Sequence, residues 1–316
     1  MTQGTRTRAT STDAAGRLLA NLESALLGGR EVVRTAVAVF LAEGHLLLED
    51  VPGVGKTTLA RALAASVEGT VGRVQFTPDL LPSDLTGVTI YQQASASFEF
   101  HPGPLFATVV IGDEINRASP KTQSALLECM QERQVTVDGT SYALPEPFMV
   151  IATQNPVEME GTYPLPEAQR DRFMAQVSIG YPPEESELQL LESGGWRPAQ
   201  TAPVLTQAEV AELIAQVGRV FVSDAVRRYV LSLVRATREH PAIELGASPR
   251  AGLQLLALAR AIAALSDRDF VVPDDVQEVL LPVLGHRIAL TRSARTAATT
   301  PAELLTEIQR AVPVPR

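Results

Sequence analysis

One segment in the first fifth of the chain limits the possible folds more than any other. Residues 45–58, HLLLEDVPGVGKTT, consist of a short apolar run and a glycine-bearing turn, and a helix-like stretch, TTLARALAA, starts at their end. A strand that passes through such a turn into a helix is the context of a Walker A phosphate-binding loop. We therefore expect an α/β fold of the P-loop type, in which the unpaired amides of a helix N-terminus bind phosphate.

The predicted nucleotide-binding residues form one consecutive run: Gly53, Val54, Gly55, Lys56, Thr57 and Thr58. Their backbone amides would surround the β-phosphate, Lys56 would reach the β- and γ-phosphates, and the Thr57 hydroxyl would bind Mg²⁺. Asp50 stands where the general motif has its first glycine. Aspartate tolerates unusual backbone angles better than most residues, so this departure weakens the match only slightly.

A second motif follows at residues 108–114, TVVIGDE, where an apolar run ends in two carboxylates. At the carboxyl edge of a parallel sheet, Asp113 would hold Mg²⁺ and Glu114 would polarise the attacking water. An Asp-Glu pair by itself is also compatible with a solvated strand end, and Gly-Lys-Thr by itself with a chance turn before a helix. Found together, the two motifs predict a nucleotide hydrolase that uses ATP and Mg²⁺, rather than a small-molecule kinase.

The chain divides into two regions of different character. Short apolar runs within residues 45–156 suit the buried strands of a parallel sheet covered by helices. From about residue 205, amphipathic helices with capping residues at their starts replace these runs. We expect a disordered leader at 1–15, an α/β core at 16–193, a linker at 194–204 and a helical domain at 205–316.

Composition and charge exclude several classes of protein. The net charge of −9 divides into −10 for residues 1–200 (14 basic and 24 acidic side chains) and +1 for residues 201–316 (13 and 12). An acidic chain is not held to nucleic acid or anionic lipid by broad electrostatics. One cysteine and four scattered histidines provide neither a disulfide nor a zinc site. Without a signal-peptide pattern or an apolar run long enough to span a bilayer, a cytoplasmic protein is expected.

Further motifs in a fixed order give the chain a family resemblance. After DEINR come ASPKTQSALLECMQE, ATQNPVEMEGTYPLPEAQRDRF and, much later, ASPR. In this order they resemble the MoxR group of AAA+ ATPases over nearly all of residues 25–290. The resemblance implies an AAA+ core with hairpin insertions, followed by a smaller all-α lid. It also implies a hexameric ring that hydrolyses ATP to remodel or activate partner proteins, often proteins with von Willebrand factor A domains.

The same resemblance assigns roles to three further polar residues. Asn155 matches sensor 1, which contacts the attacking water or the γ-phosphate. Arg172, in QRDRF, matches the arginine finger that is presented to the ATP of a neighbouring subunit. Arg250, in ASPR, matches sensor 2, which is carried by the lid and is expected to reach the γ-phosphate of its own subunit.

Two insertions bear on the kind of partner. Residues 87–104 and 134–146 alternate like hairpins, the second with an Asp138-Gly139 turn, and they resemble elements that face or flank the pore in related rings. Neither segment contains Lys or Arg, which a nucleic-acid translocase would need for phosphate contacts. A protein partner is therefore favoured. A nucleic-acid motor, a magnesium-chelatase-like motor subunit and a nucleotide-gated scaffold with little turnover remain alternatives.

Overall fold

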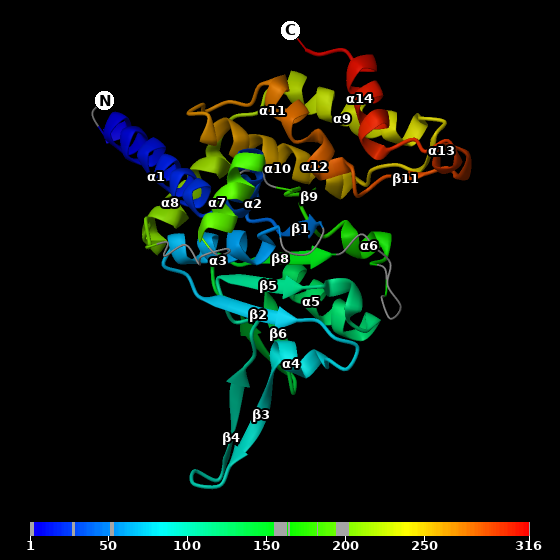
Figure 1. The fold of residues 1–316 in the computed structure, drawn as a ribbon. Helices are drawn as coiled ribbons and strands as arrows, with labels where there is room; N and C mark the ends of the chain where they lie inside the picture. The colour runs from blue at the N-terminus through cyan, green and yellow to red at the C-terminus, as the bar shows by residue number, and fades with distance from the viewer. Residues whose placement is uncertain are drawn as a thin grey trace.

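A five-stranded parallel sheet forms the centre of the molecule (Figure 1). The computed structural model describes residues 3–26, 29–50, 54–154, 163, 165–181, 183–193 and 202–315. The spatial order of the strands is β2 (Val71–Gln75), β5 (Val109–Asp113), β8 (Met149–Gln154), β1 (Leu46–Glu49) and β9 (Ala175–Val177). Every neighbouring pair is parallel, so all five carboxyl ends lie at one edge of the sheet.

Alternate side chains of these strands enter two different hydrophobic clusters. Leu46 and Leu48 pack with the helices α2 (Arg30–Leu41) and α3 (Lys56–Ser66) on one face. Leu47 packs on the other face against the side of α5 (Pro120–Glu132). The expected P-loop sheet with helices on both faces is therefore confirmed.

The prediction of a disordered leader over residues 1–15 is wrong for residues 3–15. These residues belong to α1 (Gln3–Ala25), whose Ala14 and Ala15 are buried together with Leu18 and Leu22. The early part of α1 is polar and has no apolar pattern of its own. Its helicity depends on packing of the following turns against α3 and the lid, which local sequence does not encode.

The edge strand β9 was not expected from the sequence. It contains only three residues and pairs with β1, in the register Leu46↔Ala175 to Leu48↔Val177. The short helix α6 (Glu167–Arg170) precedes it, and α7 (Glu184–Ser193) follows it. Strand β9 matters for the site because it places the segment before it, including Arg172, at the amino edge of the sheet.

The C-terminal region is helical as expected, with one small addition. It consists of α8 (Gln207–Arg219), α9 (Asp224–Glu239), α10 (Pro249–Leu265), α11 (Pro273–Glu278), α12 (Leu280–Leu284), α13 (Arg292–Thr296) and α14 (Pro301–Ala311). A two-stranded antiparallel ladder, β10 (Ile243–Leu245) with β11 (Ala289–Leu290), lies among these helices. This lid shares a continuous hydrophobic cluster with α1, α2 and α3, so it packs directly on the core. Residues 194–201 of the expected linker lie outside the described residues.

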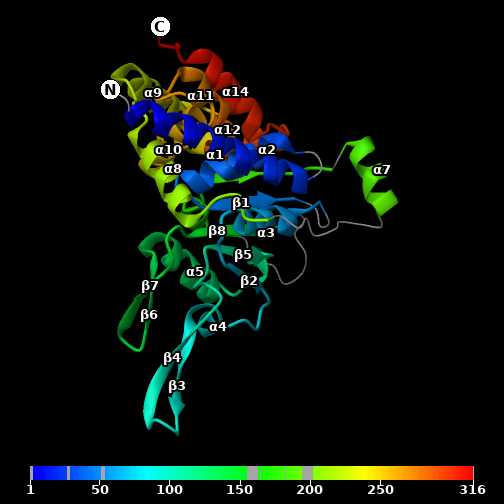
Figure 2. The same ribbon diagram turned by 90° about the vertical axis from the view of Figure 1, so that its left-hand side faces the viewer.

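Both predicted hairpins are present and project away from the lid (Figure 2). The first is β3 (Gly87–Gln92) with β4 (Ser97–Pro102), which follows the short helix α4 (Pro82–Thr86). The second is β6 (Gln134–Val137) with β7 (Thr140–Ala143), joined through Asp138 and Gly139, both at positive φ. The rings of Phe100 and Tyr142 stack at 4.0 Å and connect the two hairpins. Among the described helices, none is long and apolar enough to cross a membrane.

Candidate functional site

The Walker A loop lies between β1 and α3, at the carboxyl edge of the sheet. Gly55 caps α3 with φ +95°, a left-handed backbone that favours glycine, and Lys56 begins the helix. The Lys56 Nζ donates to the carbonyl oxygen of Asp50 at 2.6 Å. Val54 is buried, whereas Thr57 and Thr58 are half-buried in the first turn of α3. Gly53 lies outside the described residues.

Asp50 has a structural role that the loop motif did not predict. Its carboxylate is buried and accepts hydrogen bonds from the Ser178 hydroxyl at 2.9 Å and the Gly180 amide at 2.6 Å. Asp50 is not among the described residues with positive φ, so its tolerance of left-handed angles is not used. Instead, the aspartate ties the end of β1 to the segment after β9.

Acidic side chains surround Lys56. Partial burial lowers the pKa of its ammonium group, and the nearby carboxylates of Asp50, Asp113 and Glu114 oppose that shift. The ammonium group therefore sits close to both Walker B acids. This arrangement suits a lysine whose partner is a phosphate group held between it and a bound cation.

Asp113 and Thr57 form the predicted metal-binding pair. The Thr57 Oγ1 lies 3.5 Å from Asp113 Oδ1, while Asp113 Oδ2 accepts a hydrogen bond from Arg73 Nε at 2.9 Å. Mg²⁺ in nucleotide sites takes one or two protein oxygens, with water and phosphate oxygens completing its shell. The described residues contain no cluster of three metal-binding side chains. The hydroxyl and carboxylate pair fits Mg²⁺ held jointly with a nucleotide, rather than a metal held by protein alone.

Glu114, the predicted base, is held by neighbours at the mouth of the site. Its backbone is left-handed (φ 59°, ψ 52°), and its amide donates to Thr153 Oγ1 at 3.0 Å. Its Oε2 accepts from Arg117 Nη1 at 3.1 Å and from Gln75 Nε2 at 3.3 Å. The carboxylate is still 40% exposed, and can therefore contact water.

Sequence reasoning missed Arg73, Gln75 and Arg117. The first two alternate on β2, and they reach the acids because β2 pairs with β5 in the register Gln75↔Asp113. No local sequence pattern indicates which strand lies beside β5. Arg117 was within reach of sequence analysis, because it follows Glu114 by three residues in a helical turn.

Asn155 lies outside the described residues, but the strand that leads to it is described. Strand β8 ends at Gln154, between β5 and β1 in the sheet. The chain therefore leaves β8 at the same edge that carries the Walker motifs, as expected for sensor 1.

Arg172 lies at the opposite edge of the sheet from Lys56. It precedes the start of β9, and its Nη1 donates to Leu127 O at 2.8 Å and Gln131 Oε1 at 2.7 Å, near the end of α5. That end of α5 adjoins the amino end of β1, where His45 contacts Met130 O. With about 3.3 Å per residue, the four residues of β1 separate the two edges by roughly 13 Å. Arg172 is therefore not part of its own phosphate site.

Arg250 belongs to the same side as Arg172. It is exposed in the first turn of α10, and the N-cap of this helix, Ser248, contacts Asp171 at 3.1 Å. The far end of α10 reaches the start of α2, where Arg34 bonds Ser266 at 2.7 Å. This placement differs from the expectation that Arg250 reaches the γ-phosphate of its own subunit, because the lid presents it at the amino edge.

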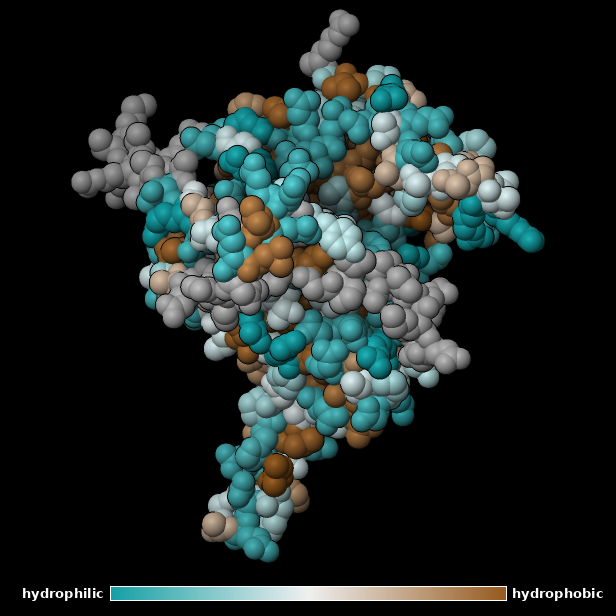
Figure 3. All heavy atoms as spheres, viewed as in Figure 1, coloured by the Kyte–Doolittle hydropathy of each residue, from teal (hydrophilic) through white to brown (hydrophobic). Residues whose placement is uncertain are grey.

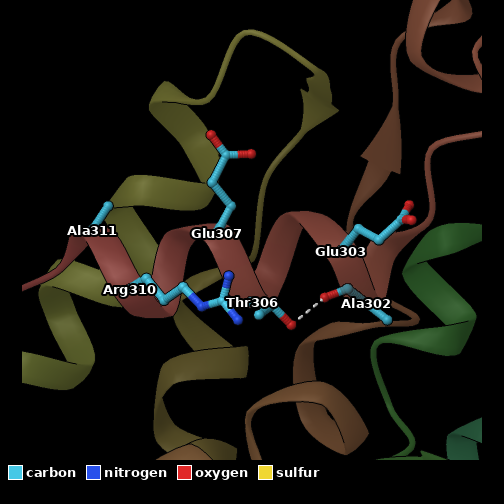
Figure 4. Close-up of a pocket in the computed structure, with 6 residues that line it drawn as sticks. All are labelled: Ala302, Glu303, Thr306, Glu307, Arg310 and Ala311. Atoms are coloured by element: carbon cyan, nitrogen blue, oxygen red, sulfur yellow. Dashed lines mark hydrogen bonds between the residues drawn. The ribbon is translucent and has the colours of Figure 1, made fainter.

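A surface hollow on the lid carries none of the predicted site residues (Figure 4). It follows one side of α14 and is lined by Ala302, Glu303, Thr306, Glu307, Arg310 and Ala311. The Thr306 hydroxyl is already bonded to the Ala302 carbonyl within the helix. None of the six residues that line it takes part in the nucleotide chemistry described above.

Comparisons with known proteins support a specific family. Residues 45–175 match the ATPase family associated with various cellular activities (AAA), and residues 235–308 match the AAA lid domain. The chain is 41% identical to Chaperone MoxR1 of Mycobacterium tuberculosis, over 95% of this chain and 82% of that protein. It is 34% identical to Protein MoxR of Paracoccus denitrificans, over 94% and 95% of the two chains.

Two further similarities cover almost the whole length. The uncharacterized protein YeaC of Bacillus subtilis is 46% identical, over 95% of this chain and 94% of the relative. A crystal structure of a candidate ATPase from Cytophaga hutchinsonii superposes with a TM-score of 0.91 at 37% identity, covering 99% and 98% of the chains. Together with the Walker motifs and the lid, these similarities show that the chain is an ATP-hydrolysing enzyme of the MoxR family of AAA+ ATPases.

Proposed function

We propose that this ATPase works as a hexameric ring in which each active site is shared between two neighbouring subunits. The observation that carries the proposal is the position of Arg172 and Lys56 at opposite edges of one sheet. A chain that holds its phosphate loop at one edge and its candidate finger at the other has half of a site on each side. Head-to-tail contacts between such chains close into a ring.

Within one subunit, the carboxyl edge binds the nucleotide. Gly55 and the amides that follow it cradle the β-phosphate, and Lys56 neutralises the terminal phosphates. Thr57 and Asp113 hold Mg²⁺, which supplies charge neutralisation of the phosphate oxygens when bound. Glu114 takes a proton from the attacking water, and Asn155 orients that water.

The contacts of Glu114 fit this role. Its Oε2 accepts hydrogen bonds from Arg117 and Gln75, which hold the carboxylate at the mouth of the site. Both partners are on the core, so the base is held before the neighbouring subunit contributes. In this proposal, hydrolysis depends on completion of the site by that neighbour.

Arg172 completes the adjacent site by stabilising the charge of the transition state. In the single chain, its guanidinium is bonded to α5, so it must exchange Gln131 for phosphate oxygens when a neighbour docks. Arg250 lies on the same side, and we assign it to the ATP of the neighbouring subunit as well. In this proposal, Arg172 and Arg250 therefore contact the same ATP of the neighbouring subunit.

The client is proposed to be a protein, with von Willebrand factor A domains as the first candidates. Four large hydrophobic side chains are exposed on the first hairpin: Val88, Ile90, Tyr91 and Phe98. Figure 3 shows hydrophobic patches among hydrophilic ones along this projection. The apolar surface and the absence of Lys and Arg favour a polypeptide over a nucleic acid. One relative is named a chaperone, in agreement with this assignment.

Mixing two inactive variants tests the shared site. Arg172→Ala protein should bind ATP but lose about 10³- to 10⁵-fold in turnover, the usual contribution of an arginine finger. Lys56→Ala protein keeps its finger but lacks a phosphate loop. A mixture should regain activity, since some interfaces then combine an intact loop with an intact finger. If mixed rings form, as judged by sedimentation, and activity stays absent, the shared site is contradicted.

The nature of the client needs a separate measurement. ATP turnover at physiological salt should be unchanged by single- or double-stranded DNA and increased by a client protein. Stimulation by DNA would instead favour the nucleic-acid motor. Turnover that stays negligible for assembled rings with every client would favour the nucleotide-gated scaffold.

A further inference from the structure

A polar network joins the segment that carries Arg172 to the lid. Asp171, the residue immediately before Arg172, lies at the end of α6 in the core. The Ser248 hydroxyl of the lid is 3.1 Å from both carboxylate oxygens of Asp171. Arg287, also in the lid, donates from Nε to Asp171 Oδ1 at 2.8 Å and from Nη2 to the Asp171 carbonyl at 3.1 Å. Ser248 and Arg287 of the lid therefore both bond to Asp171 of the core.

Breaking this connection would leave the buried guanidinium of Arg287 without its counter-ion. Its side chain is 1% exposed, and its remaining N–H groups bond Gln254 and the carbonyls of Phe173, Met174 and Val283. Burial lowers the pKa of Arg287 to about 10, with Asp171 opposing the shift, so the guanidinium stays charged at neutral pH. A buried cation that loses its counter-ion is strongly destabilised. The Asp171 carboxylate is therefore needed where it lies.

The same network reaches Arg250 through a helix cap. Ser248 is the N-cap of α10 and accepts a hydrogen bond from the Ala251 amide at 3.1 Å. Arg250 occupies the second position of that helix, and its charge is close enough to Arg287 to affect the pKa of Arg287. Asp171 thus lies between two arginines of different domains, adjacent to Arg172 in the chain and bonded to the residue that starts the helix of Arg250.

We propose that Asp171 is a positioning residue that locks the Arg172 segment to the lid, so that both arginines are presented together to a neighbouring subunit. The proposal rests on the shared active site proposed above. Asp171 itself contacts neither nucleotide nor water in this mechanism. Its effect is exerted on the partner site, and the phosphate loop of its own chain lies at the other edge of the sheet.

The first test substitutes Asp171→Asn, which keeps the shape and one acceptor but removes the charge opposite Arg287. Misplacement of a catalytic group by about 1 Å costs on the order of 10²-fold, so turnover should fall by about that factor. Binding of a fluorescent ATP analogue to the same protein should change less than about twofold, because the phosphate loop is intact. Mixing with Lys56→Ala protein should restore turnover, because the defect lies in the donated arginines.

A second test leaves the charges of Asp171 and the buried Arg287 unchanged. Ser248→Ala removes an N-cap and also the bond to Asp171, whereas Ser223→Ala removes only the comparable N-cap bond of α9 to the Val226 amide. Each substitution removes one helix cap, so the two variants should lose similar stability. Turnover should fall several-fold more in Ser248→Ala than in Ser223→Ala, with ATP-analogue affinity equal in both. This comparison tests the positioning role of Asp171 if Asp171→Asn does not fold.

Three outcomes would overturn the positioning role of Asp171. They are wild-type turnover of Asp171→Asn, a loss of ATP-analogue affinity that matches its loss of turnover, and equal turnover of the two serine variants. Each of these outcomes is distinguishable from failure of the shared site. If the shared site itself failed, Arg172→Ala protein would stay active, or Lys56→Ala protein would not restore its activity in mixed rings.

Discussion

The two edges of the central sheet are built in different ways. At the carboxyl edge, charged side chains meet in exposed contacts: Arg73 is 49% exposed beside Asp113, and Glu114 is 40% exposed. At the amino edge, polar groups are buried in hydrogen-bonded networks around His45 and Arg287. Exposed ion pairs are weak and exchangeable, whereas buried networks are rigid. An edge that admits ATP suits the first design, and an edge that presents arginines at a fixed place, as in the proposed ring, suits the second.

The largest expected loss of ATP affinity separates the two edges directly. Lys56→Ala should weaken ATP binding by about 100-fold or more, since a hydrogen bond to a charged group is worth up to about 3 kcal/mol. Folding should be little affected, because the half-buried Lys56 belongs to neither hydrophobic cluster. Titration with a fluorescent ATP analogue measures the affinity. Lys121→Ala, which removes an exposed lysine from α5, is the control and should bind ATP normally. Tight binding by Lys56→Ala would contradict the phosphate-loop assignment.

Glu114→Gln should leave ATP affinity intact and slow hydrolysis instead, because it alters the chemistry at the carboxyl edge while retaining the binding groups. Removal of a general base costs about 10²- to 10⁴-fold in rate. The variant should therefore keep ATP bound without hydrolysing it, as measured by single-turnover assays on the isolated complex. Glu128→Gln places the same substitution on the exposed side of α5 and should leave turnover unchanged. Rapid hydrolysis by Glu114→Gln would refute the assigned base.

The smallest effect concerns the amino edge and appears in stability. Buried His45 accepts from the Val150 amide at 3.0 Å and contacts Met130 O at 3.0 Å, and burial lowers its pKa to about 4. His286 is buried as well, with its pKa also lowered. The unfolded chain binds these protons near pH 6.5, so stability present above that pH is lost as the pH falls toward 4.

The substitution His45→Gln removes one of these two proton-binding groups and leaves His286 in place. Each contributes a slope of about 1.4 kcal/mol per pH unit within that window, so the variant should lose stability less steeply than the wild type. Denaturant unfolding at pH 7 and at pH 5 measures the difference. Glutamine can accept from Val150 and donate to Met130, which limits the cost at pH 7. Identical pH dependence of both proteins would show that folding does not lower the pKa of His45.

Sequence reasoning was most informative where the residues concerned are contiguous. Gly55, Lys56 and Thr57 lie within one turn, and Asp113 and Glu114 end one strand, so the chemistry of the carboxyl edge could be predicted from two short segments. The Asp138-Gly139 hairpin turn is a local signal too, and it is present as predicted. In each case, neighbouring residues in the chain are also neighbours in space.

The predictions failed where packing of distant segments decides. Residues 3–15 form part of α1 because the helix continues into a buried face, although their own sequence is polar. The three residues of β9 are too few to stand out, and only the open edge of β1 makes them a strand. Gln75 reaches Glu114 across 39 positions of sequence, which no motif encodes.

The sequence by itself determined a P-loop ATPase core with a helical lid, together with the residues predicted to bind phosphate and metal, because the motifs for these features are continuous. Only the tertiary structure decided on which side of the molecule each arginine lies. Arg172 and Arg250 are 78 positions apart, and they meet at one edge because β9 pairs beside β1 and the lid folds back onto Asp171. Strand order and domain packing arise from the burial of nonlocal apolar surface, which the local pattern of residues does not specify.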